Sequence, residues 1–322
     1  MKKIIFFILL ICAISSAQVK IIFDTDLGGD ADDLSALAML HYFVDQGDCE
    51  LLAVMCSSNG QYAVPHVDAL NRYYKYENLL IGGREDDVFT QDWFYKKPVA
   101  THLGYKLTCK DVPGTTELYR RILSKAEDKS ITIITVGPMI NIKRLLESKP
   151  DAISELSGKE LISKKVKEFS IMGGHFPEGK KEWNFFADMP GVTKYIVDNI
   201  DVPIVFSGFE VGQALQSGDV FNDIPKDHPI YVGFMHFSKN ASWKKKDFKG
   251  RILFHASFDQ TSVLYAIKDG NGKYWDKIDG GKCVVVENGD NKWVAGVKSN
   301  HAYLKLKMDA SEMVKVLEDM ML

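Results

Sequence analysis

Hydrophobic positions along the chain follow two alternating spacings. Short runs rich in β-branched and aromatic residues, typical of strands, are followed by longer runs in which apolar residues recur at helical spacing. This pattern predicts three strand–helix pairs, at residues 19–25 and 33–46, 50–58 and 64–76, and 130–137 and 139–148. It also predicts strands at 78–83, 166–174 and 202–208 and a last helix at 310–322. Such an order is typical of an α/β fold with an open, mostly parallel sheet and helices on both faces.

Polar or glycine-containing turns follow the predicted strands. They have the sequences DTDLGGDADD (24–33), SSNG (57–60), VGPMIN (136–141), MGGH (172–175) and SGFE (207–210). In an open parallel sheet, ligands bind beyond the carboxyl ends of the strands. We therefore expect these turns to meet at one functional site.

Three segments depart from the strand–helix order. Residues 84–115 show weak periodicity and are predicted to form a loop that covers the site. Residues 236–258 are a second excursion, and their basic run is interpreted as a solvated face. Residues 282–297 are predicted to form a hairpin closed by Asn288 and Gly289.

The composition is that of a globular protein with a sizeable core. Of the 322 residues, 46% are hydrophobic and 26% are charged, and the formal net charge is −3. This charge gives no reason to expect a nucleic-acid or anionic-lipid partner. We predict one principal domain over residues 18–322. The cysteines beyond residue 17 match no metal module and are interpreted as buried small hydrophobic residues, with their pairing left open.

Residues 1–17 have the pattern of a secretory signal peptide. Lys2 and Lys3 precede an apolar stretch, Ile4 to Ile14, and the small residues Ser15 and Ala17 follow it. The apolar stretch is shorter than the roughly 20 residues that span a bilayer. We expect cleavage and export to the periplasm or the exterior, with no stable membrane insertion afterwards.

The turn at residues 24–33 contains five aspartates between an apolar strand and an apolar helix. Carboxylates at such density repel one another, which raises their pKa values. A helix N-terminus stabilises a carboxylate by only roughly 0.3 to 1 kcal/mol, which is too little for so many. A bound cation offsets the repulsion, and oxygen ligands favour a hard cation, calcium before magnesium.

Two other interpretations of these aspartates fit less well. An EF-hand calcium loop needs glutamate at its twelfth position, but counting from Asp24 that position is Ser35. In a phosphatase of the haloacid dehalogenase kind, Asp24 would attack phosphorus and Asp26 would protonate the leaving group. Gly28 stands where such phosphatases usually have a hydroxyl or β-branched residue, so this interpretation is the weaker alternative.

Several motifs together resemble the inosine-uridine-preferring nucleoside hydrolases. DTDLGGDADD resembles the family's amino-terminal aspartate signature, with two residues more before the final Asp pair than in the best-known members. Further matches, in the family's order, are SSNG (57–60), VGPMINI (136–142), IMGG (171–174), EWNFFAD (182–188) and SFDQTSVLYA (257–266). On these motifs the chain is identified as a bacterial, secreted member, with the family's Rossmann-like fold from residue 20 to residue 270.

The resemblance implies calcium-dependent hydrolysis of the N-glycosidic bond of a ribonucleoside, or of a related ribosyl compound, to free base and ribose for nucleoside salvage. It implies Ca²⁺ ligands at Asp26, Asp33, Asp259 and the carbonyl of Val136, with Asp26 also the base that takes a proton from water. The residues implied to contact substrate are Asp30, Asp32, Asn59, Met172, Glu182 and Asn184. Family members are commonly dimers or tetramers, so the resemblance implies a homodimer or a homotetramer and leaves the two open.

Some assignments within these motifs rest on further reasoning. Asp30 is preferred over Asp32 as the acceptor for a ribose hydroxyl, although the longer loop blurs the register. Glu182 and Asn184 lie two apart, so on an extended segment both side chains would face the sugar. Asp24 is interpreted as structural, holding the loop by hydrogen bonds, and so is Asp188.

One departure from the family concerns the leaving group. Phe258 occupies the place of the histidine that protonates the departing base in well-known members. His255 and His175 are candidate substitutes, and the aromatic residues proposed to stack on a base instead are Trp93, Phe94, Trp183, Phe185 and Phe258. The missing histidine keeps a second hypothesis open, a calcium- and ribose-binding protein without efficient turnover.

Overall fold

The computed structural model describes residues 18–58, 60–84, 94–187, 189–268 and 272–322. The predicted signal peptide, residues 1–17, therefore lies outside the described residues. The same holds for three residues named above, Asn59, Trp93 and Asp188.

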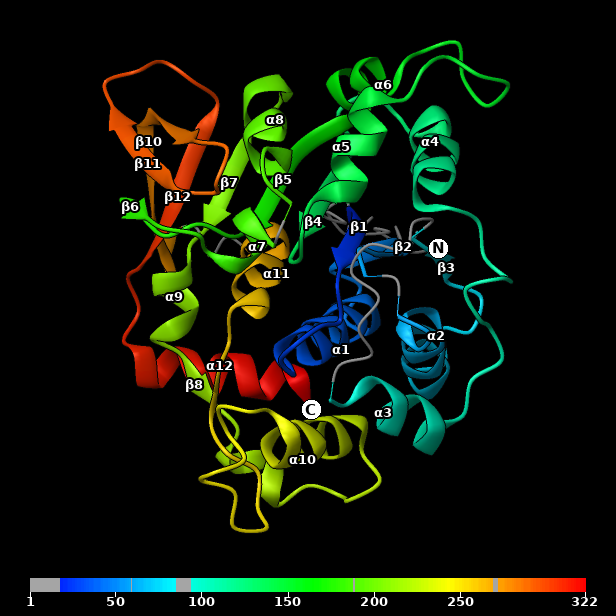
Figure 1. Ribbon diagram of the computed structural model, residues 1–322, viewed down its shortest axis with the longest axis vertical. Helices are drawn as coiled ribbons and strands as arrows, with labels where there is room; N and C mark the ends of the chain where they lie inside the picture. The colour runs from blue at the N-terminus through cyan, green and yellow to red at the C-terminus, as the bar shows by residue number, and fades with distance from the viewer. Residues whose placement is uncertain (1–17, 59, 85–93, 188, 269–271) are drawn as a thin grey trace, which may run out of the picture.

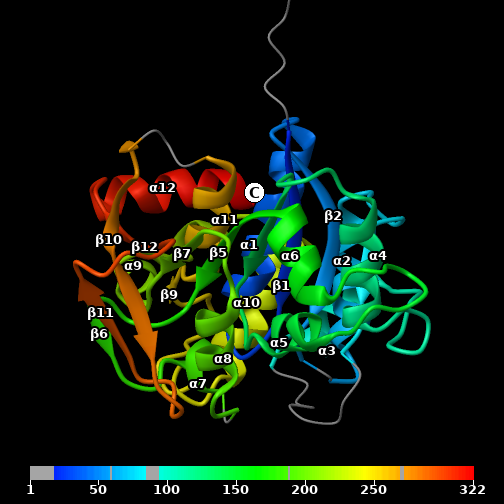
Figure 2. The same cartoon turned by 90° about the horizontal axis from the view of Figure 1, so that it is seen from above.

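A mixed sheet of 10 strands forms the centre of the molecule (Figures 1 and 2). Its strands, in spatial order, are β3 (Leu80–Gly82), β2 (Cys49–Cys56), β1 (Val19–Thr25), β4 (Ile131–Thr135), β5 (Val166–Met172), β7 (Ile204–Ser207), β12 (His301–Leu306), β10 (Trp275–Val285), β11 (Asn291–Ala295) and β6 (Glu178–Gly179). Neighbours from β3 to β12 are parallel, and the pairs beyond β12 are antiparallel. A separate pair, β8 (Gln216–Ser217) with β9 (His255–Ala256), is antiparallel.

Helices cover both faces of this sheet. Those whose buried residues belong to the first hydrophobic cluster are α1 (Asp32–Asp45), α2 (Ala63–Tyr73), α10 (Pro229–Asn240), α11 (Asp259–Ile267) and α12 (Ala310–Met321). Those of the second cluster are α4 (Thr115–Lys125), α5 (Ile140–Glu147), α6 (Gly158–Lys165) and α8 (Val192–Asn199). The remaining helical elements are α3 (Lys96–Leu103), α7 (Trp183–Phe186), α9 (Phe209–Gln213) and the 3₁₀ turn η1 (Asp219–Asn222).

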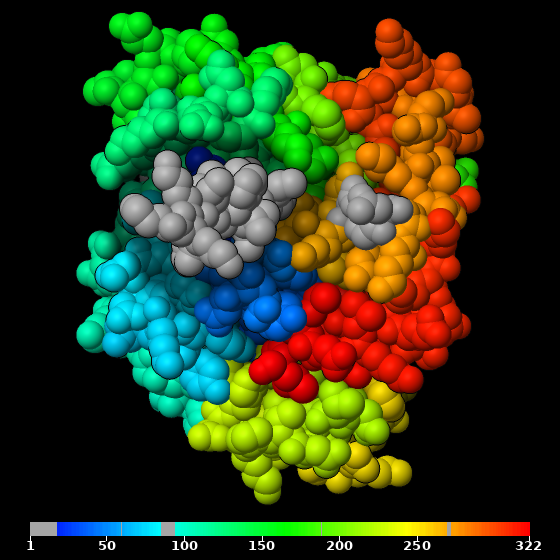
Figure 3. All heavy atoms as spheres, turned by 180° about the vertical axis from the view of Figure 1, so that it is seen from behind, coloured from blue at the N-terminus to red at the C-terminus, as the bar shows by residue number. Residues whose placement is uncertain are grey.

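Strand β1 shows how one apolar run serves both clusters. Ile21 and Phe23 belong to the first cluster, whereas Ile22, between them, belongs to the second. Successive side chains of a strand point to opposite faces, so a strand covered on both sides has no polar alternation. On the first face, α1 packs against the C-terminal α12. In Figure 3 the two helices lie side by side at the surface, α1 in blue and α12 in red.

The predicted fold class is confirmed, and the predicted strands and helices are present with ends that shift by up to a few residues. The predicted hairpin is also present, as β10 and β11, with Gly289 at a φ of 83° in its turn. The prediction for residues 84–115 is wrong in part, because this segment contains α3. Pro98 weakens the helical pattern there, but a proline is tolerated in the first turn of a helix.

Two smaller findings concern the cysteines and the membrane. Cys49, Cys56, Cys109 and Cys283 are all free thiols, and all but Cys109 are buried. Among the described residues, no helix has both the length and the apolar character that crossing a membrane requires.

Candidate active site

A pocket of about 510 Å³ lies beyond the carboxyl ends of the parallel strands. Its lining has two chemically distinct parts. The acidic part consists of Asp26, Asp30, Asp32, Asp33 and Asp259, and the aromatic part of Trp183, Phe209, Trp243 and Phe258. Turns that are far apart in the sequence therefore meet at one site, as the strand–helix pattern predicts.

The turn of residues 24–33, here called the aspartate loop, leads from the end of β1 into the start of α1 and is held in place by Asp33. The carboxylate of Asp33 accepts a hydrogen bond from the hydroxyl of Thr25, and also from the backbone amides of Leu27, at 3.1 Å, and Gly28, at 3.0 Å. A Cβ atom at position 28 would lie 2.6 Å from a carboxylate oxygen of Asp26, so a larger residue there would displace this carboxylate. The loop is thus folded around its own carboxylates.

Asp32 ties this loop to the start of α11. One of its carboxylate oxygens accepts hydrogen bonds from the backbone amides of Phe258 and Asp259, both at 3.1 Å. The carboxylate oxygens of Asp32, Asp33 and Asp259 come within 4.8 Å of one another. Segments more than 220 residues apart in the chain are joined at this point.

The electrostatics of the cluster favour a cation. Burial, and after it the neighbouring carboxylates, raise the pKa of Asp26, Asp32 and Asp259 well above its usual range. The same causes raise the pKa of Asp33 to about 6. A divalent cation would offset this repulsion, and carboxylate oxygens are the ligands of hard cations such as calcium and magnesium. The donor set therefore fits a bound metal ion.

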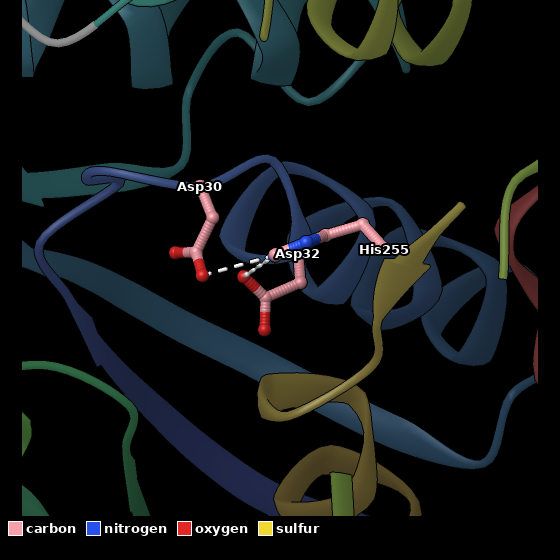
Figure 4. A group of neighbouring side chains, drawn as sticks. All are labelled: Asp30, Asp32 and His255. Atoms are coloured by element: carbon pink, nitrogen blue, oxygen red, sulfur yellow. Dashed lines mark hydrogen bonds and ion pairs between the residues drawn. The ribbon is translucent and has the colours of Figure 1, made fainter. Parts of the chain in front are cut away.

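Asp30 differs from the other loop aspartates because it has a histidine partner. The Nε2 atom of His255 lies 2.9 Å from a carboxylate oxygen of Asp30 and 3.9 Å from one of Asp32 (Figure 4). Burial alone would raise the pKa of Asp30, but the hydrogen bond and the charge of His255 outweigh burial and lower it. Asp30 is consequently the loop carboxylate that most readily stays ionised.

The turn after β4 supplies a backbone carbonyl. The side-chain amide of Asn184 donates to the carbonyl of Val136 at 3.1 Å and to the carbonyl of Met172 at 3.2 Å. A Cβ atom at Gly137 would lie 2.8 Å from the backbone nitrogen of Asp26, so this turn packs closely against the aspartate loop. Val136, Met172 and Asn184 thus form one connected wall of the pocket.

Glu182 also lines the pocket, but it is not on an extended segment. It is the N-cap of α7, and its carboxylate accepts from the backbone amides of Gly174 (2.8 Å), Asn184 (3.1 Å) and Phe185 (3.2 Å). Burial raises its pKa to about 7. The prediction that Glu182 and Asn184 lie on an extended segment is therefore wrong, because Glu182 caps α7 and Asn184 lies within it, although both residues line the pocket.

Comparison with known proteins identifies the family. The family model described as inosine-uridine preferring nucleoside hydrolase matches residues 21–314. The chain belongs to this family. Membership of this family assigns it to the N-glycosyl hydrolases. Among curated protein sequences, none matches the chain.

Solved structures of nucleoside hydrolases share the fold. A plant enzyme, PpNRh1, matches with a TM-score of 0.67 and 14% identity, and a purine-preferring ribonucleoside hydrolase from Gardnerella vaginalis with 0.69 and 13%. An inosine-uridine preferring nucleoside hydrolase from Bacillus anthracis matches with 0.64 and 12%. Each match covers 94% of this chain and 98% of the other. At such identities these matches establish the fold alone.

The nucleoside hydrolase fold brings together most of the predicted site residues. Asp26, Asp30, Asp32, Asp33, Val136, Met172, Glu182, Asn184 and Asp259 all line the pocket. Asn59 lies outside the described residues. Asp24 is structural as predicted, since it accepts from the hydroxyl of Tyr119 at 2.8 Å and from the amide of Asn141 at 3.2 Å.

Some predicted aromatic residues are placed elsewhere. Phe185 is only 2% exposed and belongs to the second hydrophobic cluster, so it is not a stacking surface for a substrate. Phe94 packs edge-on against Trp243 at 5.8 Å. Phe258 stacks on Phe209 with ring centroids 5.1 Å apart, and sequence reasoning missed Phe209 and Trp243 as lining residues.

Sequence reasoning also missed Lys96. This residue is 0% exposed, and from α3 it donates to the hydroxyl of Ser58, which in turn donates to the backbone carbonyl of Asp26. In the sequence it is one of two adjacent lysines, Lys96 and Lys97, a pattern that is typical of a solvated surface. No local signal distinguishes the buried lysine from its exposed neighbour.

Proposed function

We propose that this protein hydrolyses the N-glycosidic bond of ribonucleosides, or of a related ribosyl compound, in a calcium-dependent reaction. The observation that carries the proposal is the juxtaposition of a buried carboxylate cluster with an aromatic wall in one pocket. The carboxylates suit a cation and the polar sugar, whereas the aromatic rings suit a planar base. Family membership supplies the reaction class.

The residues proposed to hold calcium are Asp26, Asp33, Asp259 and the carbonyl of Val136. All four residues line the pocket. Asp33 lies at the start of α1, Asp259 at the start of α11, and Val136 directly after β4. When bound, the ion supplies orientation of two ribose hydroxyls and a lowered pKa of the attacking water. In the extracellular compartment, which residues 1–17 predict, calcium is plentiful enough for such a site.

The chain's own groups are proposed to share the remaining work. The carboxylate of Asp26 accepts the proton of the attacking water as general base. Asp30, kept ionised by His255, accepts a hydrogen bond from a ribose hydroxyl, and Asp32 is the rival for this role. Two backbone amides already bind one oxygen of Asp32, and its other oxygen, 3.9 Å from the Nε2 atom of His255, is the one proposed to accept from the sugar.

The leaving base is proposed to depart against aromatic rings rather than a histidine acid. The stacked pair Phe209 and Phe258 and the exposed Trp183 and Trp243 line the same pocket. Aromatic faces stabilise a stacked heterocycle and exclude water around it. Of the two candidate histidines, His255 is bound to Asp30 and is not among the residues that line the pocket, whereas His175 lines the pocket 4.0 Å from Glu210.

The experiment that tests the proposal is sugar release from a panel of purine and pyrimidine ribonucleosides. Residues 18–322 are assayed with calcium and with a chelator, beside Asp26→Asn and, as a matched control, the exposed Asp279→Asn on β10. We expect cleavage with calcium only, a loss of at least about 1000-fold in Asp26→Asn, and full activity in the control.

Other results would favour another function. Calcium binding without cleavage of any nucleoside would indicate the binding protein, and release of phosphate from phosphomonoesters with magnesium would indicate the phosphatase. Cleavage that persists in chelator would contradict the metal-dependent part of the proposal. Mass spectrometry of the exported protein tests the separate prediction that residues 1–17 are removed.

A further inference from the structure

A lysine lies inside the protein next to the aspartate loop. Lys96, at the first position of α3, is 0% exposed, whereas the adjacent Lys97 is exposed. A buried ammonium group costs considerable free energy unless opposite charges and hydrogen bonds compensate it. The nearby carboxylates supply that compensation.

A short chain of hydrogen bonds connects Lys96 to the loop. The Nζ atom of Lys96 donates to the hydroxyl of Ser58 at 2.8 Å, and that hydroxyl donates to the backbone carbonyl of Asp26 at 2.7 Å. Both side chains are buried. The positive charge is therefore fixed behind the loop, on an element that supplies none of the proposed calcium ligands.

The charge of Lys96 acts on the same carboxylates as the cation would. Burial raises the pKa of Asp26 and of Asp33, and the charge of Lys96 opposes that rise in both. Lys96 thus places a fixed positive charge beside a cluster of several negative ones.

We infer that Lys96 is a built-in countercharge of the proposed metal site. Its charge stabilises the aspartate loop when no cation is bound, and it lowers the affinity of the site for a cation. The inference rests on the proposed metal site. A fixed positive charge beside the carboxylates stabilises the metal-free loop and repels an incoming divalent ion. Lys96 is a positioning residue and has no proposed contact with substrate.

The test compares two lysines that are adjacent in sequence. Lys96→Gln removes the charge but keeps a group that donates to Ser58, and Lys97→Gln removes a charge that is exposed on the same helix. For both variants and the wild type, calcium affinity is measured by titration calorimetry, and the midpoint of thermal unfolding is measured with calcium and with chelator. We expect Lys96→Gln to bind calcium at least about tenfold more tightly and to unfold at a lower temperature in chelator.

The outcomes separate this inference from the proposed function. Unchanged or weaker calcium binding in Lys96→Gln, or a metal-free stability equal to that of Lys97→Gln, overturns the role of Lys96. If the wild type binds no calcium, the metal site itself fails, and only the lower metal-free stability of Lys96→Gln would then support the countercharge. If Lys96→Gln folds with calcium but not in chelator, this rescue by the cation supports the inference. The variant Ser58→Ala keeps the charge of Lys96, so it should bind calcium like the wild type.

Discussion

Asp24 and Asp26 are two residues apart, yet their carboxyl groups lie in opposite kinds of surroundings. Asp24 faces neutral donors from α4 and α5, namely the hydroxyl of Tyr119 and the side-chain amide of Asn141. Asp26 faces the pocket, where its neighbours include the carboxylates of Asp33 and Asp30. One carboxyl group is partnered by the protein, and the other lies in a cluster of like charges.

This difference shows how one acidic motif contains two functions. Hydrogen-bond donors within the fold satisfy a buried acid without outside help, so Asp24 can serve as a structural anchor. The carboxylates of the Asp26–Asp33 loop also accept hydrogen bonds from the fold, but their mutual repulsion is offset by added positive charge, which is why this loop is the proposed cation site. Substitutions in the two regions should therefore have opposite effects on the metal-free protein.

The largest expected effect is that of Asp259→Asn. Burial and the surrounding aspartates raise the pKa of Asp259, and no described residue donates a hydrogen bond to its carboxylate. Removing this charge relieves repulsion, so the metal-free variant should unfold at a higher temperature than the wild type. Calcium affinity should fall at least about 100-fold, because a charged ligand is lost. Calorimetry and thermal unfolding in chelator measure the two effects, and a metal-free protein that is less stable would contradict the contrast.

Asp24→Ala should do the reverse. It leaves the hydroxyl of Tyr119 buried without its acceptor and removes one of the acceptors of the Asn141 amide, which still donates to the carbonyl of Cys56. This loss should lower the free energy of unfolding by about 2 kcal/mol. The folded fraction should still bind calcium with nearly wild-type affinity, because Asp24 is not a proposed ligand. Urea unfolding and calorimetry check both statements, with Asp24→Asn as the control of similar size. Equal losses of affinity in Asp24→Ala and Asp259→Asn would show that the two regions are not distinct.

The sequence predicts the local elements of the site better than the contacts between distant segments. The strands, the hairpin and the acidic loop follow from local patterns, since strand periodicity and the spacing of the aspartates lie within short windows. The contact between His255 and Asp30 joins residues 225 positions apart, and no local pattern resolves the register of Asp30 and Asp32. The burial of Lys96 rather than Lys97 likewise depends on how α3 docks.

The helix α7 illustrates a different limit of sequence reasoning. Four residues carry too little periodicity to predict a helix, so Glu182 and Asn184 suggested an extended segment. The structure makes Glu182 a cap with three backbone donors instead. Residue types can therefore identify a motif even when they do not predict the conformation in which the motif is held.

The pH dependence of stability offers a smaller test of the Asp24 region. Burial raises the pKa of Asp24 from 3.8 to about 7, even though hydrogen bonds from Tyr119 and Asn141 and the charge of Arg84 oppose this shift. Between these values the native state keeps a proton that the unfolded state has released, so the contribution of Asp24 to stability falls as the pH rises. The difference in unfolding free energy between wild type and Asp24→Asn, in chelator, should decline by at most about 1.4 kcal/mol per pH unit. A difference that rises with pH over this range would mean that Asp24 is ionised when it is buried.

The smallest expected effect is that of Val136→Thr, which changes the side chain at the proposed carbonyl ligand with little change in its size. The proposed ligand is the backbone carbonyl of Val136, and the amide of Asn184 already fixes that carbonyl at 3.1 Å. Calcium affinity should therefore stay within about twofold of the wild type, while a hydroxyl in this buried position, 2% exposed, should cost about 1 kcal/mol of stability. Asn184→Ala is the matched variant, because it removes the group that orients the carbonyl and leaves residue 136 unchanged. If Val136→Thr weakened calcium binding as much as Asn184→Ala, the side chain at residue 136 rather than its carbonyl would control the site.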